Sequence, residues 1–558
     1  MRIVPMRGLL ALSAMIVVGC AVAHVGTLIV KGDTLQIIDR APGSPASSPS
    51  STPIMVFGLD GVSRELLYDL LRAGKLPNLA ELLGGDALAH ADLDTHLLTN
   101  LPSTTMPAWT STFTGVGAAE SGVPNNEYFV RESKTFACPA PVTFTDSGPT
   151  LEVYTDGYLN KLVSATTVYE KIHEQDHDAL IWVVMNHLYR GADTMLLAKR
   201  QVMVDAFASF VEKELAQASG KVSRATYESL DRAVIDTLIT HLKDGPTPDV
   251  LTLYLAGTDL YAHVAVEGPD QARKTYLTEV VDPALGPLVA KMRERNMLDH
   301  RWIIVTADHG HTQVLHDDAH AIDTSDSDAP GVLKSLGFHI RPFKREVASS
   351  DPYNAVLAYG GAMGFVYLAD RSRCTGEHPC MWIDPPRYKE DVLAVADAFY
   401  KNNEDGKAAP GIKGALDMIF VRVAKPVHDI DLPFEVYVGG GKTMTIDAYL
   451  ETHPHPTYVA VADRMRELAV GPHGERAGDV LLLAHNGDRD KPEDRFYFAA
   501  PYRSWHGSPS RQDSEIPLIV ANPKRDATSI AGVVEKVLGE HPYQRKITDL
   551  IMRLRESH

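Results

Sequence analysis

The sequence predicts an α/β fold with helices on both faces of a mostly parallel central sheet. Short apolar runs alternate with longer helical segments from Pro53 onward, which is typical of strand–helix–strand units. With 558 residues, 44% of them hydrophobic, the chain exceeds what one core usually holds, so we expect one large domain with a sizeable insertion. Between about Gly331 and Val470 the alternation loosens, and we expect an inserted α+β cap there.

The core strands are expected where a short apolar run is followed by polar residues. The first covers residues 54–59, and Ser63 after it can cap a helix. The apolar residues of that helix recur at helical spacing at Leu66, Leu67, Leu70 and Leu71. Further core strands are expected at residues 180–185, 250–255, 303–306, 480–484 and 516–521.

The cap is expected to contain both strands and helices. Strands are expected at residues 363–368 and 418–423, and helices around residues 392–400 and 459–468. The folded chain therefore divides into three successive parts. These are a first core part at residues 53–330, the cap at residues 331–470 and a second core part at residues 471–558.

The start of the chain resembles an export signal. Arg2 and Arg7 precede an apolar run, residues 9–18, that is too short to span a membrane. The run leads into Val17-Val18-Gly19-Cys20, which resembles the bacterial lipobox, whose cysteine is acylated and becomes the first residue of the mature protein. A plain secretory signal cut nearby is the alternative. We favour a lipoprotein signal at residues 1–20, which implies export to a bacterial cell envelope, on its periplasmic or cell-surface side, and membrane attachment through Cys20.

A linker and an acidic body follow the signal. Residues 21–52 include most of a Pro/Ser-rich tract that cannot bury a core and suits a tether. After the signal, no apolar stretch is long enough to cross a bilayer. The formal net charge of −18 argues against a protein that binds nucleic-acid duplexes by neutralising their phosphates. An acidic chain can still bind a phosphate ester if metal ions supply the local positive charge.

Three of the four cysteines follow the lipobox. Cys374 and Cys380 bracket a turn-prone loop, so a local disulfide is the expected pairing and Cys138 would stay free. A zinc site in that loop is the weaker alternative, because two thiols and His378 lack an obvious fourth ligand.

Acidic residues and histidines follow several of the expected strands. Ligands of open α/β sheets bind beyond the carboxyl ends of the strands, so we expect these side chains to converge on one crevice. Any one alone is more often a helix cap or a turn residue. Three aspartates and three histidines suit two zinc or similar divalent ions, with positions left open for a substrate. The segments are Gly58-Leu59-Asp60-Gly61, Gly257-Thr258-Asp259 running on to His263, Thr306-Ala307-Asp308-His309-Gly310 and Trp505-His506-Gly507.

A further segment supports a resemblance to a known family. It reads Thr104-Thr105-Met106-Pro107, followed by Thr114-Gly115 and then by Glu120-Ser121-Gly122-Val123-Pro124-Asn125-Asn126. The arrangement resembles the alkaline phosphatase superfamily and, within it, the nucleotide pyrophosphatase/phosphodiesterase branch. That family has a Thr directly before an aromatic or apolar residue and Pro, then Thr-Gly, then Glu-Ser-x-Gly and an Asn. The resemblance covers residues 54–522, although residues 331–470 match only in placement.

The resemblance implies an alkaline phosphatase-like fold and a role for each matched residue. Thr105 falls on the family's nucleophile, and Asn126 falls on the residue whose amide supports the transferred oxygen. The family's usual Asn-His after the Pro is Ala108-Trp109 here, which leaves recognition of the leaving group open. The absence of a modifiable Cys signature argues against a sulfatase. One metal would be held by Asp60, Asp308 and His309 together with Thr105, and the other by Asp259, His263 and His506.

The implied reaction is hydrolysis of a small-molecule phosphate ester on two divalent ions, with zinc favoured. A Thr hydroxyl is a poor nucleophile at neutral pH, and coordination to a divalent ion would lower its pKa enough to supply an alkoxide. A covalent phosphothreonine would form on Thr105 and then be hydrolysed by water. Phosphodiesters are the favoured substrate class.

Other phosphate esters stay open as substrates. Some phosphomonoesterases of the superfamily add Lys-x-Arg and Gly-Ala to hold the extra charge of a monoester. Leu188-Tyr189-Arg190-Gly191-Ala192 keeps the Arg but has an apolar residue in place of the Lys, so we expect Arg190 to bind substrate and diesters to be preferred. Phosphonoacetate hydrolases share similar motifs and are a further alternative. A non-enzymatic lipoprotein that only holds zinc predicts a missing ligand or nucleophile, and all of these positions are filled.

Two other patterns are assigned no chemistry. Residues 439–443 lack the first glycine of a phosphate-binding loop and are expected to form a flexible turn. A third metal site after Asp308 is conceivable, but we favour a polar lid for this segment, which contains His311, His316 and His320.

Overall fold

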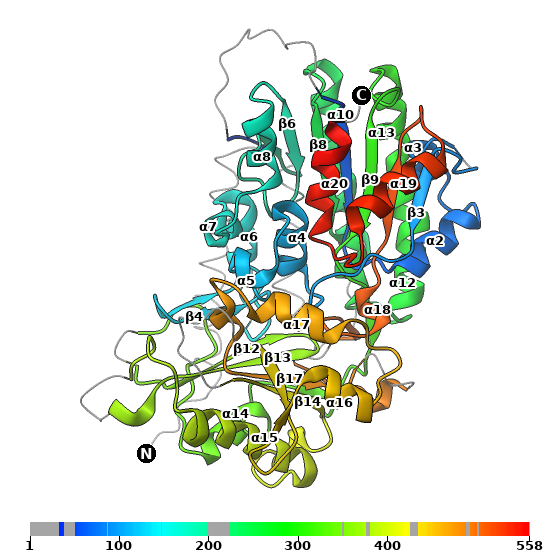
Figure 1. Ribbon diagram of the computed structural model, residues 1–558. Helices are drawn as coiled ribbons and strands as arrows, with labels where there is room; N and C mark the ends of the chain where they lie inside the picture. Colours follow the sequence, from blue (N-terminus) through cyan, green and yellow to red (C-terminus); the bar gives the residue numbers. More distant parts are fainter. Residues whose placement is uncertain are drawn as a thin grey trace, which may run out of the picture.

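The chain forms two lobes (Figure 1), and their description comes from a computed structural model. The upper lobe is built on an eight-stranded sheet and the lower lobe on a six-stranded sheet. The predicted signal, Cys20 and most of the linker lie outside the described residues. The structure describes residues 33–37, 51–85, 87–144, 146, 148–198, 202, 224–348, 351–374, 380–423, 433–486, 491–498 and 502–556. Within these ranges, no helix combines the length and the apolar character that a membrane span requires.

The eight-stranded sheet is mostly parallel, which confirms the predicted α/β fold. Five neighbouring strands in its centre run parallel to one another, whereas the strands at the two edges are antiparallel to their neighbours. The order across the sheet is β1 (Thr34–Gln36), β7 (Thr194–Leu196), β6 (Ile181–Val184), β8 (Val250–Leu255), β2 (Ile54–Leu59), β9 (Trp302–Ala307), β20 (Leu518–Ala521) and β3 (Ala91–Asp94).

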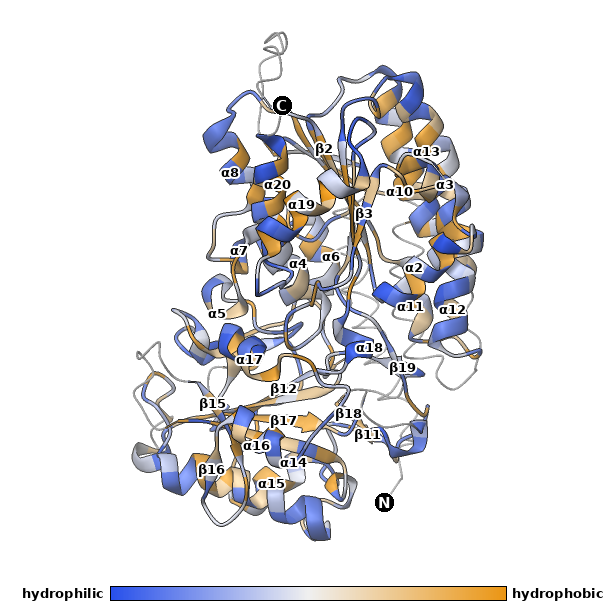
Figure 2. Ribbon diagram, turned by 45° about the vertical axis from the view of Figure 1, so that its right-hand side comes forward, coloured by the Kyte–Doolittle hydropathy of each residue, from blue (hydrophilic) through white to orange (hydrophobic). Residues whose placement is uncertain are grey.

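Helices cover both faces of this sheet (Figures 1 and 2). The predicted first helix is α2, and it buries Leu67, Leu70 and Leu71, while its N-cap residue Ser63 makes no side-chain capping bond. Figure 2 shows hydrophobic residues between the helices and the sheet and hydrophilic residues on the outer sides. One face carries α2 (Arg64–Arg72), α3 (Pro77–Leu82), α10 (Arg224–Asp244), α12 (Pro269–Tyr276) and α13 (Asp282–Glu294), and the other carries α4 (Thr105–Thr114), α8 (Val168–Gln175), α19 (Ala527–Leu538) and α20 (Lys546–Arg555).

The lower lobe contains a six-stranded antiparallel sheet with its own apolar core. In Figure 1, helices α14, α15 and α16 lie below this sheet, and α17 lies between it and the upper lobe. The strand order is β12 (Ala355–Gly360), β13 (Met363–Leu368), β17 (Val480–Ala484), β14 (Leu416–Arg422), β15 (Phe434–Tyr437) and β16 (Thr443–Met444). The helices are α14 (Ala329–Ser335), α15 (Ala394–Asp405), α16 (Ile446–Thr452) and α17 (Val461–Ala469).

Residues 480–484 form the predicted strand, but the prediction that it belongs to the core of the first sheet is wrong. This strand, β17, pairs with β13 and β14 in the middle of the six-stranded sheet. All five of its residues are buried, and such an uninterrupted apolar run does not distinguish the centre of one sheet from the centre of another. The lower lobe therefore extends past Val470, the residue at which the sequence pattern placed its end.

The cysteines are arranged as their spacing indicated. A disulfide joins Cys374 to Cys380, and Cys138 is a buried free thiol. The disulfide belongs to the lower lobe, where Cys374 follows a short turn after β13. None of the three is among the described residues that line the pocket treated below.

Strand register in the upper lobe brings three strand ends together. Leu59 at the end of β2 is paired with Leu255 of β8 on one side and with Ala307 of β9 on the other. The chain leaves all three strands at the same sheet edge, so the polar residues that follow them meet there.

Candidate active site and metal centre

Two carboxylates meet directly beyond β2 and β9. Asp60 follows β2 and Asp308 follows β9, and both side chains are almost completely buried. The backbone N–H groups of Gly61 and His309 each donate to Asp308 Oδ1 at 3.0 Å. The Tyr254 hydroxyl donates to Asp60 Oδ2. One oxygen of each carboxylate is therefore held in a fixed direction.

Gly61 lets Asp259 and His311 approach the backbone next to Asp60. Its φ is +68°, a left-handed conformation that favours glycine. A Cβ on Gly61 would lie 2.7 Å from His311 Nε2 and 2.9 Å from Asp259 Cβ. A larger residue here would push Asp259 and His311 away from Asp60.

The third carboxylate is surrounded by imidazoles. Asp259 lies in the short helix α11 (Gly257–Ala262) after β8, and its Oδ1 faces several histidine Nε2 atoms. His263 follows one helical turn later, and His506 is brought in by β19 (Ser504–Trp505), which pairs with β10 (Thr312–Gln313). The Nε2 distances from Asp259 Oδ1 are 2.7 Å for His311, 3.4 Å for His263 and 3.9 Å for His506.

Three of the histidines have the same orientation. Each places Nδ1 within hydrogen-bond distance of a backbone carbonyl, which can only accept, so the Nδ1 atom carries the proton. In the neutral ring, Nε2 then presents a lone pair to the cluster, as a metal ligand requires. The Nδ1 distances are 2.9 Å from His309 to Gly310 O, 2.7 Å from His263 to Ser504 O and 2.9 Å from His506 to Ser103 O.

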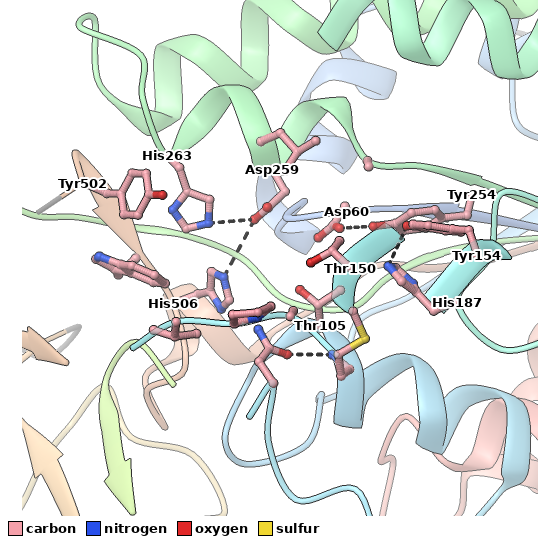
Figure 3. Close-up of a pocket in the computed structure, with 18 of the residues that line it drawn as sticks. Asp60, Thr105, Thr150, Tyr154, His187, Tyr254, Asp259, His263, Tyr502 and His506 are labelled. Atoms are coloured by element: carbon pink, nitrogen blue, oxygen red, sulfur yellow. Dashed lines mark hydrogen bonds and ion pairs between the residues drawn. The ribbon is translucent and has the colours of Figure 1, made fainter. Parts of the chain in front are cut away.

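Thr105 lies against this cluster at the beginning of a helix. It is the first residue of α4, and its Oγ1 is 3.2 Å from His309 Nε2. The unpaired N–H groups and the dipole at a helix N-terminus favour negative charge on a nearby oxygen. Asn126 Oδ1 accepts from the Met106 N–H at 2.9 Å, so its amide nitrogen is the group left to donate to a ligand. Figure 3 shows Thr105 next to Asp60 in the pocket.

Asp60 and Asp308, the carboxylates nearest to Thr105, both have raised pKa values. Burial, reinforced by the neighbouring Asp308 and Asp259, raises the pKa of Asp60 well above its usual value. Burial also raises the pKa of Asp308. Asp60 Oδ1 and Asp308 Oδ2 are buried and have no hydrogen-bond donor among the described residues. Such oxygens are the ligands that a divalent cation needs.

Asp259 has the opposite electrostatic environment. Burial by itself would raise its pKa, but His263 and His311 outweigh burial, and the pKa of Asp259 lies well below its usual value. Burial lowers the pKa of His311 to about 3 and that of His506 well below its usual value. His311 and His506 are therefore neutral and available as ligands near pH 7.

These residues form two clusters that fit divalent metal ions. The first metal group is Asp60, Asp308 and His309, whose ligand atoms all lie within 4.8 Å of one another. The second metal group surrounds Asp259 and contains His263, His311 and His506. A further combination of close ligand atoms, Asp259 with His309 and His506, links the two groups. The unpartnered oxygens and the aligned Nε2 atoms together fit cation binding.

The metal groups lie within the part of the chain that matches a known protein family. A family model described as type I phosphodiesterase/nucleotide pyrophosphatase matches residues 54–355, which is more than half of the chain. The chain belongs to the type I phosphodiesterase/nucleotide pyrophosphatase family. This confirms the branch that the motifs indicated, and members of the family are metal-dependent hydrolases.

Three related proteins share little sequence identity with this chain. An uncharacterized pyrophosphatase/phosphodiesterase of Schizosaccharomyces pombe is 24% identical over 314 residues, a match that covers 54% of each chain. The match thus spans about half the length of that relative. Murine ectonucleotide pyrophosphatase/phosphodiesterase 5 has a TM-score of 0.50 at 13% identity, covering 90% of this chain and 94% of its own. The human protein of the same name has a TM-score of 0.48 at 12% identity, with the same coverage. The murine structure supports the alkaline phosphatase-like fold.

Every ligand position predicted from the motifs lies in the clusters, and His311 joins them. The sequence pattern placed His311 in a polar lid, but its side chain is fully buried against Asp259, so the lid prediction is wrong for this residue. The Ser504 hydroxyl donates to the Ala262 carbonyl, and its oxygen can accept from His311 Nδ1 at 3.1 Å. His311 Nε2 then faces Asp259 in the same way as the predicted ligands do. The sequence signal that could have identified His311 as a ligand was its position two residues after His309, directly before a short strand.

Arg190 is not part of this site, contrary to the prediction that it binds substrate. Its guanidinium donates to Glu170 and to the carbonyls of Asn160, Val163 and Ala165. It does not line the pocket around Thr105. The motif did not reveal that the residues before α8 offer carbonyls to this side chain, which makes it a structural residue.

The pocket around Thr105 has two contrasting sides and a volume of about 200 Å³. One side holds the metal groups, Thr105 and Asn126. In Figure 3, Tyr154, Tyr254 and His187 lie across Asp60 and Thr105 from His263 and Tyr502. We define the uncharged wall as the lining residues Ala140, Pro141, Val142, Phe144, Thr150, Tyr154, Met185, His187, Leu230, Tyr254, Ala256 and Leu260.

Proposed function

We propose that the protein hydrolyses small-molecule phosphodiesters with two divalent metal ions, zinc being favoured, and with Thr105 as the nucleophile. One observation carries this proposal. Thr105 Oγ1 lies at a helix N-terminus beside the first metal group, where two buried carboxylate oxygens have no hydrogen-bond donor among the described residues. Such an arrangement suits a cation next to a nucleophile.

The proposed metal ligands are divided between the two groups. Asp60, Asp308 and His309 would hold one ion near Thr105, and Asp259, His263 and His506, with His311 beside them, would hold the other. Bound ions would lower the pKa of the Thr105 hydroxyl and stabilise negative charge on the phosphoryl and leaving oxygens.

The chain's own groups orient the reaction. The Thr105 hydroxyl releases its proton to solvent as Oγ1 forms a bond to phosphorus. The bond to the leaving oxygen breaks at the same time, and that oxygen takes a proton from water, so the leaving group departs as an alcohol. The Asn126 amide nitrogen donates to a non-bridging oxygen as charge shifts in the transition state. Water then forms a new bond to phosphorus, the Thr105 ester bond breaks, and Thr105 regains its proton. The second product is a phosphate monoester.

Diesters are preferred over monoesters in this proposal. A monoester carries an additional negative charge, which some relatives hold with an arginine. Arg190 is the residue that matches this arginine, and its guanidinium is bound elsewhere. Among the described lining residues of the pocket, none is a lysine or an arginine.

Substitution of the nucleophile tests the proposal. Thr105→Ala should abolish turnover of bis-p-nitrophenyl phosphate while the zinc content stays unchanged, and Thr105→Ser should retain part of the activity because a hydroxyl survives. Asn126→Ala should cost about 2.7–4 kcal/mol, the usual effect of removing one donor to a developing charge. Quenching the wild-type enzyme during turnover and mapping its peptides should locate a phosphoryl group on Thr105. Near-normal turnover by Thr105→Ala would refute the mechanism.

We also propose that the enzyme is exported and attached to a bacterial membrane through an acylated Cys20. The support is the lipobox-like sequence Val17-Val18-Gly19-Cys20 and the Pro/Ser-rich tract that follows it. Cys20→Ser should release the protein from the membrane fraction or block its processing. Unchanged processing and membrane association would contradict the lipoprotein assignment.

A further inference from the structure

The uncharged wall offers a substrate mainly carbon surface. It contains aliphatic side chains from helix α10 and the loop before α6 (Gly148–Thr155), together with aromatic rings. The hydroxyl of Tyr254 already donates to Asp60. The hydroxyl of Tyr154 lies 2.9 Å from His187 Nε2. The two tyrosine hydroxyls are therefore already engaged, and neither is left to hold an anionic group.

The histidine in this wall adds no positive charge. His187 is 3% exposed, and burial lowers its pKa to about 3. Its Nδ1 has no hydrogen-bond partner among the described residues. A neutral imidazole cannot neutralise a phosphate.

One loop of the wall is held in place by a buried carboxylate. The buried carboxylate of Glu127 accepts from the N–H groups of Val142 and Thr143 at 2.8 and 3.0 Å. Its other oxygen accepts from the Tyr359 N–H of β12 at 2.8 Å, which ties the loop to the second sheet. Binding of an apolar group therefore requires little ordering of the loop.

The charges around the pocket leave no surplus positive charge for additional anions. Two divalent cations would carry four positive charges, which the three carboxylates and the Thr105 alkoxide would match. Outside the metal groups, Asp146 is the one charged residue among the described lining residues, and its charge is negative. Among the described lining residues, a second phosphate would find no lysine or arginine to pair with, and burying an unpaired charge costs free energy.

We propose that the substrate is a singly charged phosphodiester with an uncharged aromatic or aliphatic ester group packed against the uncharged wall. Pyrophosphates and diesters that carry additional anionic groups are poor substrates. This inference rests on the proposed two-metal diester hydrolysis and narrows its substrate class. The reaction releases the uncharged group either as a free alcohol or as its phosphate monoester.

A matched pair of substrates tests the inference. Thymidine 5′-(p-nitrophenyl phosphate) and the same compound with a 3′-phosphate differ only in one anionic group and release the same chromophore. The zinc-loaded enzyme should cleave the first with a kcat/KM at least about tenfold higher, which corresponds to about 1.4 kcal/mol. Equal or faster cleavage of the 3′-phosphorylated compound would overturn the inference while leaving diester hydrolysis intact.

A change of charge in the wall sharpens the same test. Leu260 is partly exposed, so Leu260→Lys adds a cation with little risk to the fold, and Leu260→Gln is a matched uncharged control. Leu260→Lys should reduce the ratio of the kcat/KM values of the two substrates several-fold, whereas Leu260→Gln should leave this ratio unchanged. Calorimetry of both compounds with zinc-loaded Thr105→Ala measures selectivity without turnover. Tighter binding of the 3′-phosphorylated compound would contradict the inference even if the proposed reaction failed.

Discussion

The two metal groups contain similar ligands in opposite electrostatic settings. In the first group, Asp60 and Asp308 face each other with one imidazole, and burial raises the pKa of both carboxyls. In the second group, burial would raise the pKa of Asp259, but His263 and His311 outweigh burial and lower it. Unpartnered buried oxygens occur only in the first group among the described metal-group residues.

This contrast indicates what each group needs. The two carboxylates of the first group repel each other when both are charged. A cation is therefore required to hold both in their charged forms. In the second group without metal, His311 Nε2 can carry the proton and donate to Asp259 Oδ1, 2.7 Å away, which keeps the group together. We therefore expect the first group to depend on metal for charge balance and the second to retain its shape without metal.

The largest effect is expected when the group next to Thr105 is broken. Asp308→Asn should lower kcat/KM for bis-p-nitrophenyl phosphate by about a thousandfold or more, since a Lewis-acid metal contributes several kcal/mol and 1.36 kcal/mol is tenfold in rate. His263→Ala should cost less, about 10–100-fold, because His311 lies beside the same carboxylate. Steady-state kinetics after zinc reconstitution compares the two. Equal losses would show that the groups are not distinct.

Asp60 of the first group and Asp259 of the second should change the stability of the metal-free protein in opposite directions as pH changes. Asp60 has a raised pKa in the folded state. Its favourable contribution to the free energy of unfolding is therefore present at low pH and is lost as pH rises above the usual carboxyl range. Asp259 has a lowered pKa, so its contribution is present above the usual carboxyl pKa and is lost as pH falls below it.

Thermal unfolding in the presence of a chelator measures this difference. At pH 7, Asp60→Asn should raise the Tm of the metal-free protein by a few degrees, and Asp259→Asn should lower it by a similar amount. At pH 4 the gain from Asp60→Asn should shrink, because protonation already relieves the repulsion. Destabilisation by both substitutions at pH 7 would contradict the proposed contrast.

A smaller effect is expected from the histidine that the motifs did not assign. His311→Gln removes an imidazole that contacts Asp259, and affinity for one zinc ion should fall by about 10–100-fold, as for other residues that support a ligand. Competition with a chromophoric chelator gives the affinity directly. His320→Gln is the matched control, because His320 binds Asp317 and the Glu493 carbonyl instead. Identical affinities in the two variants would exclude His311 from the site.

The sequence predicted the centre of the site well because strand ends are local features. An apolar run followed by a polar residue identified Asp60 and Asp308, and parallel register then required them to meet. Thr105 and Asn126 came from motif spacing and lie in the same pocket. The core strands were likewise predictable, since their burial is continuous.

Features that depend on distant contacts could not be read from the sequence. Whether β17 joins the first or the second sheet depends on which strands flank it, and its apolar residues suit either. Arg190 matches a substrate-binding motif, but carbonyls from a neighbouring segment bind its guanidinium. His311 is buried because Gly61 and Ser504 approach it from far along the chain. The chemistry of a side chain was thus easier to predict than its partners.

Zinc titration of the metal-free enzyme tests the two-group account most directly. We predict two ions per chain for the wild type, one ion for Asp308→Asn and one ion for His506→Ala, measured by elemental analysis after equilibrium dialysis. The two variants should each lose a different ion, so the double variant should bind neither. A single ion in the wild type, or an unchanged count in both variants, would contradict the account.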